Sequence, residues 1–276
     1  MSHASGSAAA PKRVTVRTFA QAKARGVPLV MVAAYDALFA RIADDGGVDA
    51  VLVGDSLGNV VAGLDTTVPV TLDQMIYHGA AARRGTSRAL LVVDMPFLTY
   101  QVSTERALLN CGRVMQETGC DAVKVEGGSP EAAETVRALV RAGIPVMGHL
   151  GFTPQSVHVL GGFRVQGRDG EAAERMLAEA RRLEEAGAFA VVLELVPAEL
   201  ARRVSEALAV PTIGIGAGLG CDGQVLVMAD LLGLTDGFAP KFLKRYATFA
   251  ADARDAVGRF AADVRGRAYP GDEHAF

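Results

Sequence analysis

Ionisable side chains recur at the points where short apolar runs of this chain end. The run VLVGDS, for example, suits a buried strand up to its glycine and then ends in an acid and a hydroxyl. The polar residues in such positions are Asp55, Ser56, Asp94, Lys124, Glu126, His149 and Glu194. An ionised carboxylate at the edge of a packed core is costly unless it is paired or bound to a cation. Four acids in such positions therefore indicate one shared site.

The acids suggest a site for a hard metal ion. Three carboxylates without any cysteine and with few imidazoles would form an oxygen-rich site, a donor set that favours Mg²⁺ or a similar ion over zinc. Mg²⁺ keeps open positions for water and substrate oxygens, so it would hold a small oxyanion. Lys124 and Glu126 are two residues apart in a strand, so their side chains point to the same face. We therefore expect the lysine to meet a substrate carboxylate beside the metal, with Ser56 adding a hydroxyl or a backbone N–H.

Structural interpretations of the same residues stay open at this point. Asp55 could cap the following turn, since aspartate is a favoured cap residue. Lys124 and Glu126 could be a simple ion pair at a strand end. His149 could be a hydrogen-bonded structural histidine, and Glu194 could pair with an arginine.

The elements that would position these residues are short apolar runs that alternate with amphipathic stretches. The expected strands are 29–34, 50–54, 89–94, 122–126, 145–149, 190–194 and 212–216. The segment 224–233 fits an eighth strand or a helix equally well. The clearest helical patterns are 103–119, 131–143 and 171–187, and each is followed by or ends in glycine, a helix stop signal.

Regular alternation of strand and helix predicts parallel strands joined by crossover helices. The strand runs are apolar on consecutive residues, as expected for strands that are covered on both faces. Seven or eight such units in about 250 residues favour a (β/α)₈ TIM barrel as a single α/β domain, with an open doubly wound sheet as the alternative. All the strand-end acids would then open on one face of the barrel, where active sites are built.

The expected domain organisation is simple. We predict a disordered N-terminal tail at 1–13, a barrel domain with a C-terminal helix at 14–265, and a flexible C-terminal tail at 266–276. The glycine-rich segment 214–218 could bind phosphate after the seventh strand, but it lacks GxGxxG spacing, and close backbone packing is the better interpretation.

Composition excludes several classes of function. The 276 residues are 50% hydrophobic and carry a formal net charge of −3, with no tryptophan. No basic block is present, so nucleic acid and membrane surfaces are not expected partners. The N-terminal segment lacks the apolar stretch of a signal peptide. Three scattered cysteines (Cys111, Cys120 and Cys221) indicate a reducing compartment, and we expect a cytoplasmic location.

Several motifs together resemble one enzyme family, the ketopantoate hydroxymethyltransferases. They cover nearly all of residues 19–246 in order, and their combination is highly specific. The motifs are AYD (34–36), VGDSLG (53–58), VPVTLDQMIYH (68–78), DMPF (94–97), VKVEGG (123–128), GHLGFTPQS (148–156), GGFRVQGR (161–168), GIGAG (214–218), CDGQVLV (221–227) and PKF (240–242). Ala33 and Asn59 depart from the pattern, where threonine and methionine are expected.

The resemblance implies a Mg²⁺-dependent barrel enzyme of pantothenate biosynthesis, which transfers a hydroxymethyl group from 5,10-methylenetetrahydrofolate to 3-methyl-2-oxobutanoate. The product would be 2-dehydropantoate, formed through a Mg²⁺-stabilised enolate. The implied metal residues are Asp55, Asp94 and Glu126, the implied substrate-binding residues are Asp55, Ser56, Asp94 and Lys124, and the implied proton acceptor is Glu194. His149 is a possible accessory residue. Such enzymes are homo-oligomers, often decamers.

Two other functions fit parts of the pattern. A Mg²⁺-dependent 2-oxo-acid lyase or mutase of the phosphoenolpyruvate type would need the same chelate and enolate, but many such lyases use a loop cysteine, and the cysteines here are poorly placed. A non-catalytic binding barrel would satisfy its strand-end acids with salt bridges. The sequence carries no residue signature for the pterin of a folate.

Overall fold

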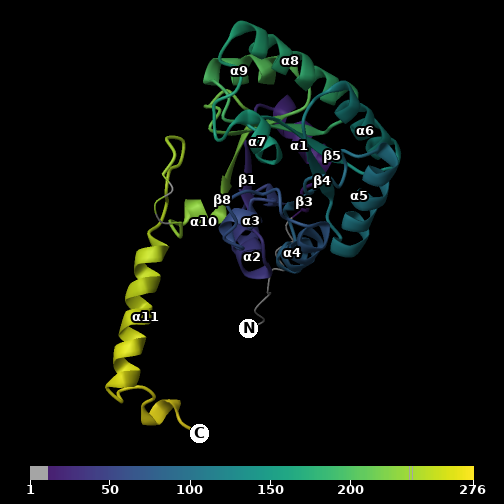
Figure 1. Ribbon diagram of the computed structural model, residues 1–276. Helices are drawn as coiled ribbons and strands as arrows, with labels where there is room; N and C mark the ends of the chain where they lie inside the picture. Colours follow the sequence, from purple (N-terminus) through teal and green to yellow (C-terminus); the bar gives the residue numbers. More distant parts are fainter. Residues whose placement is uncertain (1–11, 236, 238) are drawn as a thin grey trace, which may run out of the picture. The chain divides into compact units, whose positions relative to one another are not determined.

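The apolar runs form parallel strands because helices cover their outer faces and neighbouring side chains fill their inner faces. A computed structural model describes residues 12–235, 237 and 239–276. Its strands close into a barrel in which each strand pairs with the next one along the chain (Figure 1). The strands are β1 (Leu29–Ala33), β2 (Ala50–Val53), β3 (Leu90–Asp94), β4 (Ala122–Glu126), β5 (Val146–Gly151), β6 (Ala190–Glu194), β7 (Thr212–Ile215) and β8 (Gly223–Val227). The predicted (β/α)₈ barrel is confirmed.

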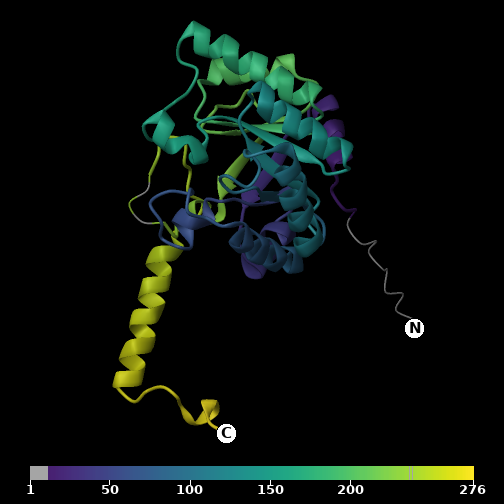
Figure 2. The same ribbon diagram turned by 45° about the vertical axis from the view of Figure 1, so that its right-hand side comes forward.

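Helices surround the strands, and α5, α6, α8 and α9 form an arc along one side of the barrel (Figures 1 and 2). The helices of the barrel are α1 (Val16–Ala24), α2 (Ala37–Asp45), α3 (Leu57–Val60), α4 (Leu72–Gly85), α5 (Thr104–Thr118), α6 (Pro130–Arg141), the 3₁₀ turn η1 (Pro154–Ser156), α7 (Val157–Leu160), α8 (Gly170–Glu185) and α9 (Ala198–Ala207). Each of the three predicted helical patterns is a helix whose observed ends lie within two residues of the predicted ones.

Side-chain caps fix where the main helices begin. Ser103 accepts a hydrogen bond from the backbone N–H of Arg106 at the start of α5, and Asp169 accepts one from Ala172 at the start of α8. A serine or aspartate in this position satisfies one of the free N–H groups of the first turn. The loops that precede these helices follow β3 and β5, so the caps also fix where those loops end.

Helix α1 lies against the amino-terminal end of the barrel. Its Phe19 is fully buried and packs edge-on against Phe189, which directly precedes β6, with ring centroids 5.6 Å apart. Its Lys23 forms an ion pair of 2.8 Å with Asp222, which directly precedes β8. The side chains at the carboxyl ends of the strands therefore lie at the other end of the barrel.

The chain divides into two compact units, residues 1–226 and 227–276. The second unit contains α10 (Met228–Leu231), α11 (Phe249–Arg265) and the 3₁₀ turn η2 (Asp272–His274). The segment 224–233 thus holds both of the structures that its pattern allowed, because β8 ends at Val227 and α10 begins at the next residue. Residues 1–11 lie outside the described residues, and the predicted bounds 1–13, 14–265 and 266–276 stay predictions.

The structure also bears on the expectations about the cysteines and about membrane-spanning segments. Cys111 and Cys120 are buried, Cys221 is half-buried, and all three are free thiols. Burial raises the pKa of Cys111 to about 12 and that of Cys120 to about 11, so both are unreactive at neutral pH. No helix among the described residues is long and apolar enough to cross a membrane.

Candidate active site

Strand register brings the predicted site residues together. In the β3–β4 pair, Asp94 lies opposite Lys124. In the β4–β5 pair, Glu126 lies opposite His149, and in the β5–β6 pair, Gly151 lies opposite Glu194. Parallel strands in this register place the ends of β3 to β6 at one rim of the barrel. Asp55, which follows β2, joins them because its backbone N–H donates to Oδ2 of Asp94 at 3.1 Å.

The buried side chains form a closed ring of contacts. Lys124 Nζ lies 3.1 Å from Oδ1 of Asp94 and 3.0 Å from Nδ1 of His149. Gln155 closes the other half of the ring, because its Nε2 donates to Oδ2 of Asp55 at 2.9 Å and its backbone N–H donates to Oε2 of Glu126 at 3.0 Å. The ring is completed by a distance of 3.5 Å between Oε1 of Glu126 and Nδ1 of His149.

Lys124 and His149 have complementary protonation states. Burial alone would lower the pKa of Lys124, but the carboxylates of Asp94, Glu126 and Asp55 raise it, so the ammonium group is retained. Burial and the adjacent Lys124 lower the pKa of His149, while Glu194 raises it, and the net direction is downward. A neutral imidazole that accepts from Lys124 at Nδ1 carries its proton at Nε2, a tautomer assigned here from the hydrogen-bond partners. That nitrogen lies 3.3 Å from Oε2 of Glu194.

The ring contains more negative charge than its own groups neutralise. Burial raises the pKa of Asp55 well above its usual value, and repulsion from Asp94 and Glu126 raises it further. Burial also raises the pKa of Glu126 to about 7, with Lys124 lowering it and Asp94 raising it. Oδ1 of Asp94 and Oε1 of Glu126 are buried without a hydrogen bond of normal geometry to any residue that the structure describes. The charge balance favours an added cation.

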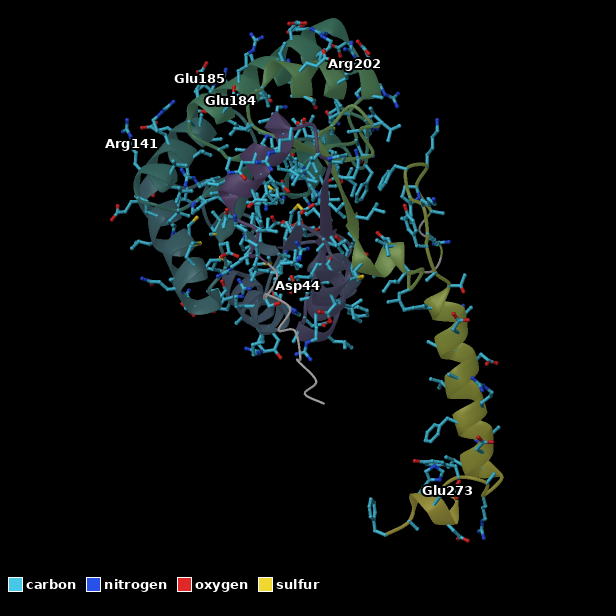
Figure 3. The ribbon with its side chains drawn as sticks, turned by 180° about the vertical axis from the view of Figure 1, so that it is seen from behind. Asp44, Arg141, Glu184, Glu185, Arg202 and Glu273 are labelled. Atoms are coloured by element: carbon cyan, nitrogen blue, oxygen red, sulfur yellow. The ribbon has the colours of Figure 1, made fainter. Side chains whose placement is uncertain are left out.

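Asp44, a buried acid outside the ring, has a carboxylate whose hydrogen bonds are all satisfied. Asp44, labelled in Figure 3, accepts hydrogen bonds from the backbone N–H groups of Ser87, Arg88 and Ala89 and from the hydroxyl of Ser87. Burial would raise the pKa of Asp44, yet these hydrogen bonds together lower it. Asp44 therefore needs no further partner, in contrast to Asp55 and Glu126.

Glu194 lies at the most open point of the site. Its side chain is 18% exposed, against 4% for Glu126 and 3% for His149. The backbone on each side of it is held in place, because Phe152 N–H donates to the carbonyl of Glu194 at 2.8 Å and Leu195 N–H donates to that of Ile215 at 2.9 Å. The main chain that carries this carboxylate is therefore fixed, while the side chain is open to a bound molecule.

Ser56 lies next to Asp55 and directly precedes the short helix α3. Its Oγ lies 2.9 Å from the hydroxyl of Tyr35. Gly54 lets this turn approach Asp94, because a Cβ at Gly54 would lie 2.8 Å from Oγ of Ser56 and 3.4 Å from Oδ2 of Asp94. The predicted placement of Ser56 next to the acids is therefore explained by local backbone packing.

Sequence reasoning missed three polar residues of this site, namely Gln155, Tyr100 and Tyr35. Gln155 is buried, and its Oε1 accepts from the hydroxyl of Tyr100 at 3.0 Å, while the Tyr100 oxygen accepts from Glu126 N–H at 2.9 Å. Gln155 and Tyr35 belong to motifs noted in the sequence, GHLGFTPQS and AYD. These motifs were the available signal. The search for polar residues at the ends of apolar runs missed both side chains because neither one ends such a run.

The structural alternatives resolve in different ways. Asp55 is not a helix cap, because its carboxylate accepts from Gln155 and α3 is preceded by Ser56. Lys124 pairs with Asp94 rather than with Glu126, and Glu194 faces a histidine rather than an arginine. In the segment 214–218, a Cβ at Gly218 would lie 2.6 Å from that of Ala198, in agreement with close packing.

The donor set suits Mg²⁺ bound partly through water. Among the described residues, no three His, Cys, Asp or Glu side chains form a ready-made metal cluster, and this includes Asp55, Asp94 and Glu126. Mg²⁺ commonly binds through one or two carboxylates and keeps several waters. Two observations fit a Mg²⁺ ion that keeps some of its waters better than one bound only by protein ligands. Asp94 and Glu126 each have an oxygen without a hydrogen bond, and the pKa of Asp55 is raised.

The fold and the site together define a class of protein, the (β/α)₈-barrel enzymes with an acidic site at the carboxyl ends of their strands. A family model described as ketopantoate hydroxymethyltransferase matches residues 13–272. The chain belongs to the ketopantoate hydroxymethyltransferase family and is an enzyme, a hydroxymethyltransferase. It is 57% identical over 251 residues to a 3-methyl-2-oxobutanoate hydroxymethyltransferase of Deinococcus radiodurans, covering 91% of this chain and 88% of that one. It is 53% identical over 265 residues to the enzyme of that name from Syntrophotalea carbinolica, covering 96% and 99%.

Solved structures with low sequence identity share the fold. A phosphonopyruvate hydrolase in complex with oxalate and Mg²⁺ aligns with a TM-score of 0.60 at 13% identity, covering 94% of this chain and 93% of that one. A 2,3-dimethylmalate lyase, described as a member of the PEP mutase/isocitrate lyase superfamily, aligns with a TM-score of 0.55 at 17% identity, covering 95% and 91%. These alignments support the barrel architecture.

Proposed function

We propose that this chain transfers a hydroxymethyl group from 5,10-methylenetetrahydrofolate to 3-methyl-2-oxobutanoate and forms 2-dehydropantoate, the first committed step of pantothenate biosynthesis. The observation that carries the proposal is the buried ring of Lys124, Asp94, Asp55, Gln155, Glu126 and His149 with Glu194 at its open edge. Such a ring provides a cation site for a small oxyanion and a carboxylate base beside it. Membership of the family agrees with this chemistry.

The metal would be Mg²⁺, held by Asp55, Asp94 and Glu126, directly or through water. When bound, the ion would withdraw electron density from the keto group and so make the C3 hydrogen of the substrate more acidic. The protein residues keep the three carboxylates in place for this purpose. Gln155 orients Asp55, and the backbone N–H of Asp55 orients Asp94.

Lys124, Ser56, Asp55 and Asp94 would hold the keto acid. The retained ammonium of Lys124 supplies a positive charge for the substrate carboxylate, next to the oxygen of Asp94 that lacks a hydrogen bond. The hydroxyl of Ser56 supplies a further donor. His149 would be an accessory residue that keeps the Lys124 ammonium and the Glu194 carboxylate apart and oriented.

Glu194 would accept the proton from C3. The C–H electron pair then forms the bond to the methylene carbon, and the two bonds from that carbon to the folate nitrogens break. A water molecule supplies the hydroxyl oxygen. The two released protons, one from C3 and one from the water, end on the folate nitrogens, so tetrahydrofolate is the second product. A general base must lie within direct or one-water reach of the proton, and the open position of Glu194 allows this.

A turnover assay with mass detection of 2-dehydropantoate tests the proposal. Formation of the product should require the keto acid, methylenetetrahydrofolate and Mg²⁺, and should stop when EDTA is added. A lyase or mutase of the phosphoenolpyruvate type would instead consume a 2-oxo acid without folate. The buried Cys111 and Cys120 and the half-buried Cys221, which lies near the start of β7, are not placed for the loop cysteine of such lyases. Turnover without folate would favour that alternative.

Two expectations about the whole molecule belong to the same proposal. A homo-oligomer, as large as a decamer, would have to cover the apolar side chains Val257, Phe260 and Val264, which recur at helical spacing in α11 and are exposed. Light scattering after gel filtration measures this directly. The three free thiols agree with a cytoplasmic location.

A further inference from the structure

The loop after β5, residues 152–168, contributes Gln155 to the site described above. The sequence motif GGFRVQGR, which lies further along the same loop, has no role in that chemistry. Its side chains combine an exposed aromatic ring with unpaired positive charge. Phe163 is 66% exposed, and its ring stacks on the buried ring of Phe152 with centroids 4.6 Å apart and an interplanar angle of 32°. One face of the Phe163 ring is therefore supported by the protein, which fixes the ring as a platform for another ring.

The same loop carries positive charge. Arg164 and Arg168 are exposed, and neither forms an ion pair with any other residue that the structure describes. The stretch 152–168 contains no acidic residue, and the first acid after it, Asp169, is engaged in capping α8. Guanidinium groups without protein partners suit carboxylates, which they bind through two parallel hydrogen bonds.

The loop is fastened to the backbone around the proposed base. At one end, Phe152 N–H donates to the carbonyl of Glu194 at 2.8 Å. At the other end, Gln166 N–H donates to the carbonyl of Leu195 at 2.9 Å. The aromatic platform and both arginines thus belong to a segment tied to Glu194, the most exposed of the site acids. A second substrate must enter on the open side of the site at Glu194, because the other side chains of the ring are almost fully buried.

We propose that the loop 152–168 binds the folate co-substrate, with Phe163 stacking on an aromatic ring of the folate and with Arg164 and Arg168 binding the glutamate carboxylates. This inference rests on the proposed function and adds the residues that hold its second substrate. The chemistry of the ligand agrees with the loop at both ends, since a folate joins flat aromatic rings to an anionic tail. The methylene carbon would then face C3 of the keto acid at Glu194.

Equilibrium binding of two ligands separates the two contacts. Tetrahydrofolate carries the glutamate tail, and tetrahydropteroate lacks it. The Arg164→Ala, Arg168→Ala double variant should bind tetrahydrofolate about tenfold more weakly than wild type, because it loses the charge-assisted hydrogen bonds to the glutamate carboxylates. It should bind tetrahydropteroate as tightly as wild type does. Phe163→Ala should weaken both ligands. Phe163→Leu keeps apolar contact with Phe152, and it should also weaken both ligands while retaining the wild-type melting temperature.

Arg181→Ala, on the exposed surface of α8, removes the same charge elsewhere and should change neither affinity. Affinities within twofold of wild type in all the loop variants would overturn the inference, as would a loss of affinity that appears only together with a change in oligomeric state. Hydrogen exchange at C3 of the keto acid by the wild-type protein, without folate, tests the proposed function separately. A wild-type protein that exchanges C3 but binds folate independently of these residues would refute the loop assignment alone.

Discussion

Nε2 of Gln155 lies 2.9 Å from Oδ2 of Asp55, and this hydrogen bond joins two residues that are 100 positions apart in the chain. The same nitrogen donates to the carbonyl of Met95 at 2.8 Å. One amide thus connects the loop after β5 to the ends of β2 and β3. The orientation of an acid in the proposed metal site depends on a neutral side chain that is itself held by Tyr100.

Replacing Gln155 by glutamate should disable the site with little change in volume. The new carboxylate would repel Asp55 instead of donating a hydrogen bond to it, so Asp55 would turn away from its position beside Asp94. We expect Mg²⁺ affinity to fall at least tenfold, measured by calorimetric titration. Gln21→Glu on the exposed surface of α1 is the matched control. Wild-type Mg²⁺ affinity in Gln155→Glu would show that the amide does not position Asp55.

Asp55→Asn should weaken Mg²⁺ binding far more than it changes stability. The substitution removes a carboxylate whose pKa is already raised by burial and by Asp94 and Glu126, so the folded protein without metal should tolerate it or even gain stability. Activity titrated against Mg²⁺ should shift to at least tenfold higher concentrations, while the melting temperature in EDTA stays the same or rises. An unchanged Mg²⁺ titration would remove Asp55 from the metal site.

The metal-free protein should lose stability as the pH rises through about 7. Burial raises the pKa of Glu126 to about 7, above the usual value near 4.5, so between these values the folded state binds more protons than the unfolded chain. The contribution of Glu126 is therefore fully present below pH 4.5 and is lost above pH 7, at a slope of up to about 1 kcal/mol per pH unit. Urea unfolding in EDTA between pH 5.5 and 8 measures this.

Glu126→Gln provides the control for that pH dependence. The variant cannot ionise at this position, so its stability should vary less with pH than that of wild type. Mg²⁺ should also stabilise wild type more at pH 8 than at pH 6, because the ion competes with a proton for the carboxylate. Identical slopes in wild type and Glu126→Gln would assign the pH dependence to other groups.

Gly151→Ala should displace Glu194. Gly151 has φ of +93°, and a Cβ at this position would lie 2.2 Å from the carbonyl oxygen of Glu194. Gly143→Ala, with φ of +87° and no atom within 4 Å of its Cβ, carries the same backbone penalty of about 1 kcal/mol without the clash. We expect Gly151→Ala to be less stable than Gly143→Ala and to lose most of its exchange of the substrate hydrogen. Equal behaviour of the two variants would contradict this role for Gly151.

The barrel could be predicted because buried parallel strands are uniformly apolar and end abruptly. Strands β4 and β6 begin and end at the predicted residues. In each of them the last residue is a glutamate (Glu126 or Glu194) that directly follows apolar residues and so marks the end of the strand. Strand β8 was ambiguous because its five residues continue without a break into the apolar turn of α10. Apolar composition alone does not separate two elements that share one run.

The site could be predicted only as far as ionisable residues mark it. Asp94 and Lys124 were identified, but their pairing depends on strand register, which the sequence does not specify. Gln155 carries no charge and lies beyond the strand in η1, so no periodic pattern or charge pattern points to it. The closed ring of contacts follows from tertiary structure rather than from any local signal.

The central claim is that Glu194 removes a proton from a keto acid held at the ring of buried acids. Hydrogen exchange at C3 of 3-methyl-2-oxobutanoate in D₂O, followed by NMR with Mg²⁺ and without folate, measures this step alone. Wild type should exchange the hydrogen, and Glu194→Gln should exchange it at least a hundredfold more slowly, the range attributed to a general base. Equal rates for the two proteins would contradict the account.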